Sequence, residues 1–102
     1  MEVTILLGSS SDMPVAEKCT KILKQFDVTY QLRVASAHRS PKFVEQIIHD
    51  AEADGCMVFI AMAGLAAALP GAVAALTTKP VIGVPCGGSC LLYTSPSPRD
   101  DR

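Results

Sequence analysis

A chain of 102 residues has room for one small domain. Hydrophobic residues make up 49% of it, which predicts a buried core and argues against disorder over most of the length. The formal net charge of −1, with basic residues scattered along the chain, argues against a nucleic-acid or membrane-surface partner. The apolar runs are too short to cross a bilayer and no signal peptide precedes the first predicted strand, so we expect a soluble, cytoplasmic protein.

The cysteines do not form a recognisable metal or redox motif. No two of them have the C-x-x-C spacing, and no histidine stands at ligand spacing from them, so a metal site is not expected. In a cytoplasmic protein we expect these thiols to be reduced. The four residues are Cys19, Cys56, Cys86 and Cys90.

The first third of the chain predicts a strand, a helix and a second strand. Residues 3–7 are a nearly continuous apolar run, typical of a strand covered on both faces in a parallel sheet. The turn formers of 8–12 follow, and Pro14 stands at an early helical position, where its missing N–H is not needed. The apolar residues that recur at helical spacing are Val15, Cys19, Ile22, Leu23 and Phe26. Residues 28–34 alternate between apolar and polar, which predicts a strand near the edge of the sheet.

The second helix has clear signals at both ends. Ser40 is a good N-cap, Pro41 suits the first helical position, and Gly55 stands just past the end. Its predicted buried stripe is Phe43, Val44, Ile47, Ile48 and Ala51.

The remaining elements complete an alternating order. We expect strands at 57–61 and 80–84, a short helix at 70–76 and a loop at 85–89. The order β-α-β-α-β-α-β with right-handed crossovers predicts an α/β fold with a parallel, doubly wound sheet.

The character of the chain changes at Cys90. Residues 90–102 have neither helical nor strand periodicity and are rich in Pro and Ser, so we expect a disordered tail. The tail also resembles a translated adapter appended to an interrupted reading frame. Because no helix is predicted after the fourth strand, we expect one face of the sheet to lack its cover.

Three loops follow the first three strands and should open at one edge of the sheet, since the strands are parallel. The loop 8–12 offers three hydroxyls, several amides and a helix N-terminus, which suits a phosphate; an ordinary capped turn is the alternative. Asp12 is either a helix cap or a ligand for ribose hydroxyls.

The loop 36–40 carries the side chains best suited to chemistry. Arg39 can clamp a phosphate through two parallel hydrogen bonds, and His38 can move a proton near neutral pH. The alternative is an exposed histidine without a role. His49, among acidic residues on the second helix, is expected to be a solvated helix residue.

The loop 63–71 is nearly devoid of large polar side chains. Small residues let a ligand approach the backbone amides; tight helix–sheet packing is the alternative. Cys86 has no identifiable acid–base partner in the sequence, which favours a structural thiol over a nucleophile.

Taken together, four segments closely resemble the N5-carboxyaminoimidazole ribonucleotide mutase family of purine biosynthesis. They match in order and spacing from Val3 to about Ser89, and are 8–12, 36–41, 63–71 and 80–85. The resemblance implies a flavodoxin-like three-layer α/β/α domain over residues 1–89, incomplete at its C-terminus. It also implies a homo-octamer that converts N5-carboxyaminoimidazole ribonucleotide to 4-carboxyaminoimidazole ribonucleotide and back, without metal or organic cofactor.

The resemblance also assigns roles to residues of this chain. The loop 8–12 is implied to bind the small-molecule ribonucleotide, with Asp12 near the ribose. Phosphate contacts fall to Ser36 and Arg39, and proton transfer to His38. The implied substrate-binding residues are Gly8, Ser9, Ser11, Asp12, Ser36, Arg39, Gly64, Ala66 and Leu69, the last three in the loop that lines the carboxylate pocket.

Two departures from the family pattern limit what the resemblance implies. Ala68 stands where the family often has a histidine. Family members also continue with another strand and further helices, so we expect the 102-residue chain to fold poorly by itself. A cooperative melt at high temperature, together with an octamer-sized mass, would contradict that expectation.

Three other functions are compatible with an α/β domain of this size. A flavodoxin-like electron carrier needs aromatic residues around a flavin, yet Tyr30 is in a predicted strand and Tyr93 in the tail. A phosphoacceptor receiver domain needs acidic residues at the strand ends, where this chain has Gly8 and Ala63, so we discard it. An inactive fragment of the mutase is the third. Within the family, Arg39 after His38 favours the mutase over the variant that takes free carbon dioxide.

Overall fold

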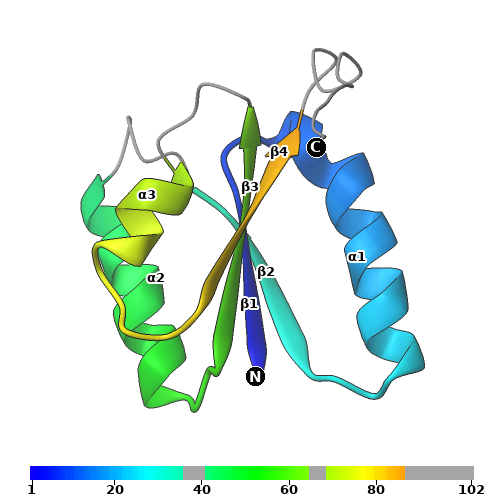
Figure 1. Cartoon of the computed structure of the whole chain (residues 1–102), viewed down its shortest axis with the longest axis horizontal. Helices are drawn as coiled ribbons and strands as arrows, with labels where there is room; N and C mark the ends of the chain where they lie inside the picture. The colour runs from blue at the N-terminus through cyan, green and yellow to red at the C-terminus, as the bar shows by residue number, and fades with distance from the viewer. Residues whose placement is uncertain (36–40, 65–68, 87–102) are drawn as a thin grey trace, which may run out of the picture.

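The computed structural model describes residues 1–35, 41–64 and 69–86 (Figure 1). The strands are β1 (Val3–Leu7), β2 (Tyr30–Val34), β3 (Val58–Gly64) and β4 (Val81–Cys86). The helices are α1 (Met13–Gln25), α2 (Pro41–Ala53) and α3 (Leu69–Ala74), and a 3₁₀ turn, η1, spans Ser10–Asp12 ahead of α1.

The described strands form one parallel sheet in the order β2-β1-β3-β4. This is the order of the first four strands of a flavodoxin-like sheet, so the predicted fold class is confirmed. In register, Leu7 of β1 lies opposite Val34 and Met62, and Gly64 of β3 lies opposite Cys86. The strands therefore end together at one edge. The predicted edge position of the second strand is also confirmed.

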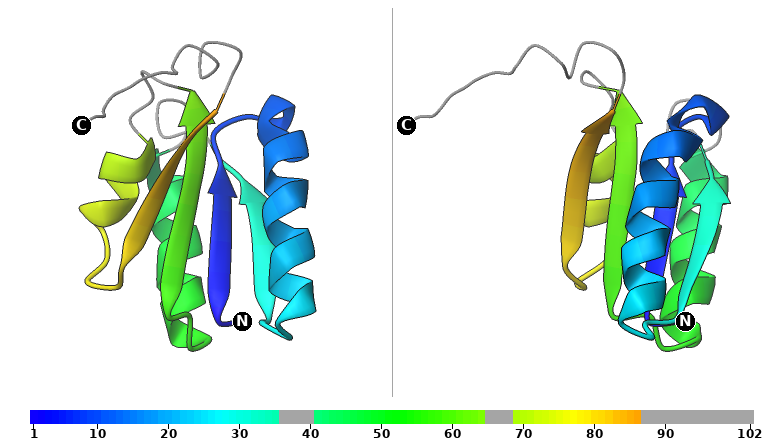
Figure 2. Two further views of the ribbon diagram at one scale, coloured as in Figure 1. Left: turned by 45° about the vertical axis from the view of Figure 1, so that its right-hand side comes forward. Right: turned by 90° about the vertical axis from the view of Figure 1, so that its right-hand side faces the viewer.

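The sheet is the middle of three layers (Figure 1). Helix α1 covers one face, while α2 and α3 cover the other (Figures 1 and 2). Alternate residues of β1 point to the two faces: Ile5 packs in the core beneath α1, and Leu6 packs in the core with α2. All five residues of β1 are buried, which explains why its sequence is apolar except at Thr4 rather than alternating.

Three predicted core residues are exposed instead. Ile22 is 55% exposed and Phe26 is 74% exposed, because α1 buries a narrow stripe and ends at Gln25, before Phe26. Phe43 is 44% exposed: it lies on the first turn of α2, and its ring meets Arg33 of the edge strand β2 instead of the core. The rest of the predicted α2 stripe is buried as expected, namely Val44, Ile47, Ile48 and Ala51.

Several predicted boundaries shift because pairing extends the strands. β3 runs to Gly64 rather than to residue 61, and β4 includes Pro85 and Cys86, which were expected in a loop. These two residues pair with Ala63 and Gly64. Proline is tolerated here because β4 is an edge strand within the described sheet, where one row of N–H groups needs no partner.

On the side of α1, β4 is covered unevenly in the part of the chain that the structure describes: Val84 and Cys86 pack with the core beneath α1, but the start of the strand at Ile82 is open. Ile82 pairs with Ile60, which packs in the core beneath α1, yet Ile82 itself is 51% exposed. In the right-hand view of Figure 2, α1 lies in front of the middle of the sheet, and β4 lies to one side of the helix. Among the described residues, the cover is therefore missing only at Ile82, and the expectation of an uncovered sheet face stays a prediction. The predicted tail, residues 90–102, lies outside the described residues.

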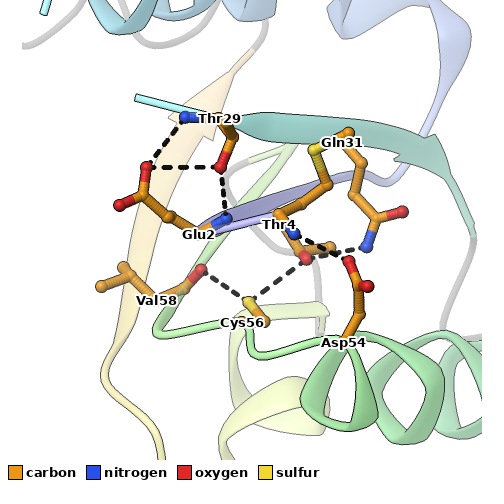
Figure 3. A network of polar contacts seen from close by, with 8 residues as sticks. Glu2, Thr4, Thr29, Gln31, Asp54, Cys56 and Val58 are labelled. Atoms are coloured by element: carbon orange, nitrogen blue, oxygen red, sulfur yellow. Dashed lines mark hydrogen bonds and ion pairs between the residues drawn. The ribbon is translucent and has the colours of Figure 1, made fainter. Parts of the chain in front are cut away.

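A polar network ties the strands together at the edge where they begin (Figure 3). The hydroxyl of the fully buried Thr4 donates to Cys56 Sγ over 3.3 Å and accepts from Gln31 Nε2 over 3.1 Å. The Cys56 thiol donates in turn to the carbonyl oxygen of Val58 over 3.3 Å. The two buried polar groups of this network, the Thr4 hydroxyl and the Cys56 thiol, thus have partners, and β1, β2 and the start of β3 are held in register.

A second clamp at the same edge joins the starts of β1 and β2. The amide of Thr29 donates to the Glu2 carboxylate over 2.9 Å, and the amide of Glu2 donates to the Thr29 hydroxyl over 3.0 Å (Figure 3). The N-terminal ammonium pairs with Asp54 over 2.7 Å. These contacts stabilise the edge where the strands begin. The candidate loops lie at the opposite edge, where the strands end.

Candidate functional site

The loops that carry the candidate residues leave the sheet from adjacent points. The amide of Gly8 donates to the Met62 carbonyl over 2.8 Å, and the amide of Ala35 donates to the Leu7 carbonyl over 2.7 Å. A Cβ on Gly8 would lie 3.1 Å from Ala63 Cβ, which is tighter than ordinary packing. Glycine is favoured there because a side chain would have to push the neighbouring residue of β3 aside.

The loop 8–12 folds as a capped turn whose three serines are all exposed, with the hydroxyls of Ser9 and Ser11 side by side. Ser9 Oγ accepts from the Ser11 amide over 3.2 Å and lies 3.0 Å from Ser11 Oγ. The Ser9 carbonyl accepts from the Asp12 amide over 3.0 Å, which closes the turn that leads into α1. The predicted cap is thus present, on Ser9. Because both hydroxyls remain at the surface, the cap leaves them accessible to a ligand.

Asp12 is buried, with 8% of its surface exposed, at the N-cap position of α1. Its side chain makes no capping hydrogen bond, so the cap interpretation fails for this residue. Within residues 1–35, 41–64 and 69–86, the carboxylate has no hydrogen-bond or ion-pair partner. Buried polar groups nearly always have one, so the unpartnered carboxylate at the edge where the strands end makes Asp12 the strongest candidate for a ligand contact among the described residues.

The end of β3 is open toward the same edge. Gly64 is exposed, and a Cβ built on it would meet nothing within 4 Å. Leu69 differs: it is 2% exposed and packs in the core with Val73. Its side chain therefore supports α3, and only its backbone is left for a role in the pocket.

The other predicted site residues lie outside the described residues. They are Ser36, His38, Arg39 and Ala66, together with the predicted cap Ser40 and the substituted position Ala68. The described ends of the first segment are Ala35 at the end of β2 and Pro41 at the start of α2. The structure brings Gly8, Ala35 and Ala63 together, so the loops begin at one place.

The described cysteines have structural surroundings. Cys56 belongs to the polar network, and Cys86 is buried and donates to the Val84 carbonyl over 3.7 Å. Burial raises the pKa of the Cys19 thiol, which keeps this group protonated near neutral pH and so a weak nucleophile. No three His, Cys, Asp or Glu side chains cluster as metal ligands among the described residues. None of the described helices combines the length and the apolarity that a bilayer crossing requires.

A surface hollow of about 280 Å³ lies away from this edge. It is lined by Glu52, Ala75, Leu76, Thr77 and Thr78, where α2 ends and the chain leads from α3 to β4. The Thr77 hydroxyl donates to the Glu52 carboxylate, so the polar groups of the hollow satisfy each other. The hollow is not the candidate site.

One contact near the site was not anticipated. The guanidinium carbon of Arg33, on β2, lies 5.7 Å from the centre of the Phe43 ring, on α2. The only hint in the sequence is that both residues stand within three positions of the segment 36–40. Phe43 was expected in the core, and its exposure became apparent only in the structure.

Known proteins resemble this chain over most of its length. The family model described as AIR carboxylase matches residues 2–94. The N5-carboxyaminoimidazole ribonucleotide mutase of Methanocaldococcus jannaschii is 59% identical over 83 residues, which are 81% of this chain and 51% of that protein. The mutase of Pyrococcus abyssi is 48% identical over 90 residues, 88% of this chain and 52% of that protein.

A solved structure supports the same relationship. The crystal structure of PurE from Treponema denticola superposes with a TM-score of 0.82 at 35% identity, covering 90% of this chain and 59% of that one. The chain thus spans about half the length of the two curated relatives.

Proposed function

Because this chain belongs to the AIR carboxylase family, we propose that it carries the ribonucleotide site of an enzyme that interconverts N5-carboxyaminoimidazole ribonucleotide and 4-carboxyaminoimidazole ribonucleotide in purine biosynthesis. The observation that carries the proposal is the buried, unpartnered carboxylate of Asp12 beside the exposed hydroxyls of Ser9 and Ser11. A carboxylate accepts hydrogen bonds and donates none, so its ligand must present donors. Ribose hydroxyls are such donors.

The phosphate of the ribonucleotide is assigned to the neighbouring segment. Arg39 has the planar fork of donors that fits a phosphate, and Ser36 adds a hydroxyl. The segment 36–40 starts where Ala35 is hydrogen-bonded to β1, next to Gly8. Because the loop 8–12 and the segment 36–40 leave the sheet from neighbouring strands, one ligand could contact Asp12 through its sugar and Arg39 through its phosphate.

The proposed reaction moves one carboxyl group and one proton. The bond from the exocyclic nitrogen to the carboxylate breaks and releases carbon dioxide, whose carbon is then attacked by C4 of the imidazole. The new carbon–carbon bond forms as C4 loses its proton to His38, and the nitrogen gains a proton. No electrons are exchanged with another group, so the proposal needs no cofactor.

The small residues after β3 suit the carbon dioxide step. Gly64 leaves open space where a side chain would otherwise stand, and Ala66 follows in the same loop. A small pocket keeps carbon dioxide beside C4 and excludes water that would otherwise capture it. Leu69 contributes from below by packing α3 against the sheet.

The assembly and location belong to the proposal as well. Full-length relatives are proposed to act as homo-octamers in the cytoplasm, without nucleic-acid or membrane partners. An inactive fragment of that enzyme is the alternative, and the exposed Ile82 on β4 is the one structural observation in its favour. Turnover measured with the 102-residue chain itself decides between the two.

The carrying observation is tested by Asp12→Asn. We expect the Kd for 5-aminoimidazole ribonucleotide, the species left when the carboxyl group departs, to rise roughly 10- to 100-fold, because a charge-assisted hydrogen bond is lost. Stability should change by no more than about 1 kcal/mol, since the side chain caps nothing and only its charge at the helix N-terminus is removed. Calorimetric titration and urea unfolding measure the two quantities.

The matched control is Asp27→Asn. Asp27 is exposed at the other end of α1 and has a φ of 57°, a conformation that asparagine also tolerates. Both its Kd and its stability should match the parent chain. Binding by the Asp12 variant as tight as that of the control would place Asp12 outside the ribonucleotide site.

A further inference from the structure

Arg33 and Phe43 lie on the two sides of the segment 36–40. Arg33 is the fourth residue of β2, and Phe43 is in the first turn of α2. The Arg33 guanidinium carbon is 5.7 Å from the Phe43 ring centre, within the range of a cation–π contact. The contact therefore joins the two elements on either side of the loop between β2 and α2.

The register of the sheet explains why these two side chains meet. Arg33 lies opposite Leu6, and Leu6 packs in the core with Val44 of α2. Arg33 thus projects on the face that α2 covers, at the outer edge of the sheet. Because Phe43 is 44% exposed, burial alone does not determine where its ring lies.

The local charges leave the ring as the partner of Arg33. No acidic residue occurs between positions 28 and 44, while Arg33, Arg39 and Lys42 all do. Arg33 makes no ion pair with any residue in 1–35, 41–64 or 69–86. The face of an aromatic ring is the remaining local group that attracts a guanidinium.

On the side that faces the core, the two ends of this loop are held by different contacts. Ala35 is 4% exposed, shares the core with Val44, and donates from its amide to the Leu7 carbonyl. These contacts anchor the start of the segment and the first buried residue of α2. On the solvent side, the ends of the loop are joined by the Arg33–Phe43 contact.

We propose that Arg33 is a positioning residue: its guanidinium, over the Phe43 ring, holds the outer ends of β2 and α2 together and so fixes the distance between the two points, Ala35 and Pro41, that the segment 36–40 connects. The role of that segment rests on the proposed function, in which His38 and Arg39 meet the substrate. Arg33 itself need not touch the ligand.

Hydrogen exchange in the absence of ligand tests the coupling in the 102-residue chain. Arg33→Gln and Phe43→Leu should each speed amide exchange within residues 35–44 by about two- to fivefold, the effect expected of an exposed cation–π contact. The double variant should show no more than the larger single effect, because one contact is lost in all three. Arg33→Lys should keep part of the protection, since an ammonium also binds a ring face.

Titration with 5-aminoimidazole ribonucleotide links the contact to binding. Both single variants should raise the Kd by a similar two- to fivefold, in proportion to the exchange. Lys42→Gln is the matched control: it removes one positive charge from an exposed residue of the same turn and should leave the exchange rates unchanged. If Lys42→Gln raises the Kd as much as Arg33→Gln does, charge rather than position explains the binding effect and the proposal fails.

Other outcomes also count against the proposal. Unchanged exchange in either single variant, full additivity in the double variant, or equal acceleration in β1 and β3 would each overturn it. Failure of the parent chain to bind the ribonucleotide would instead count against the proposed function. The exchange experiment decides the role of Arg33 in either case.

Discussion

Replacing His38 by asparagine should lower the turnover of carboxyaminoimidazole ribonucleotide by about 10²- to 10⁴-fold, the usual contribution of a general acid–base. Asparagine retains hydrogen-bonding capacity but cannot take up a proton near neutral pH. Because the lost interaction acts on the C4 proton in the transition state, the Kd for the ribonucleotide should stay within about threefold. Steady-state rates and calorimetric titration measure these two effects separately.

The experiment needs an active parent and a matched histidine. Since the chain spans about half the length of its curated relatives, turnover is measured in the chain extended to the length of a relative. His49→Asn is the control, because His49 is exposed on α2 and should be replaceable without loss of rate. Turnover near that of the parent in the His38 variant would remove His38 from the proposed mechanism.

Replacing Ile5 by alanine should destabilise the chain by about 2–5 kcal/mol, as expected for a buried isoleucine that leaves a cavity. Ile5, on β1, is fully buried between the sheet and α1. Small domains have only about 5–15 kcal/mol of stability in total, so the loss is a large part of it. The midpoint of urea unfolding, followed by circular dichroism, measures the difference.

Ile82→Ala provides the comparison on the same face of the same sheet. Ile82 is 51% exposed, so its truncation should change stability by no more than about 1 kcal/mol, the range of strand propensities. If Ile5→Ala does not fold, Ile5→Val should still show a loss of about 0.5–1.5 kcal/mol. Equal losses for the two alanine variants would mean that β4 is covered in solution.

The fold could be predicted because its signals are local. The apolar run of 3–7, Pro41 at the start of α2 and Gly55 beyond its end each indicate an element from a few neighbouring residues. Gly55 indeed has a φ of 89°, which a glycine adopts without strain. The alternating order of elements then leaves few sheet topologies to consider.

The candidate site could be predicted only in part. Residue type and spacing identified the loop 8–12, and its serine cap was among the interpretations considered. They did not separate Ser9, which caps the turn, from Asp12, which is buried without a partner. They also assigned Leu69 to the pocket without showing that its side chain packs in the core, which leaves its backbone for that role. The roles of Ser36, His38, Arg39 and Ala66 stay predictions.

By itself, then, the sequence determined the α/β class, the order of elements and which loops share an edge, because capping, periodicity and parallel pairing depend on residue type over short distances. Only the tertiary structure decided which side chains are covered. Ile5 and Ile82 are the same residue on the same face, yet only the first lies under α1. Phe43 follows the helical spacing of the core but meets Arg33 at the surface. Burial depends on what packs above a residue, and that information lies in distant parts of the chain.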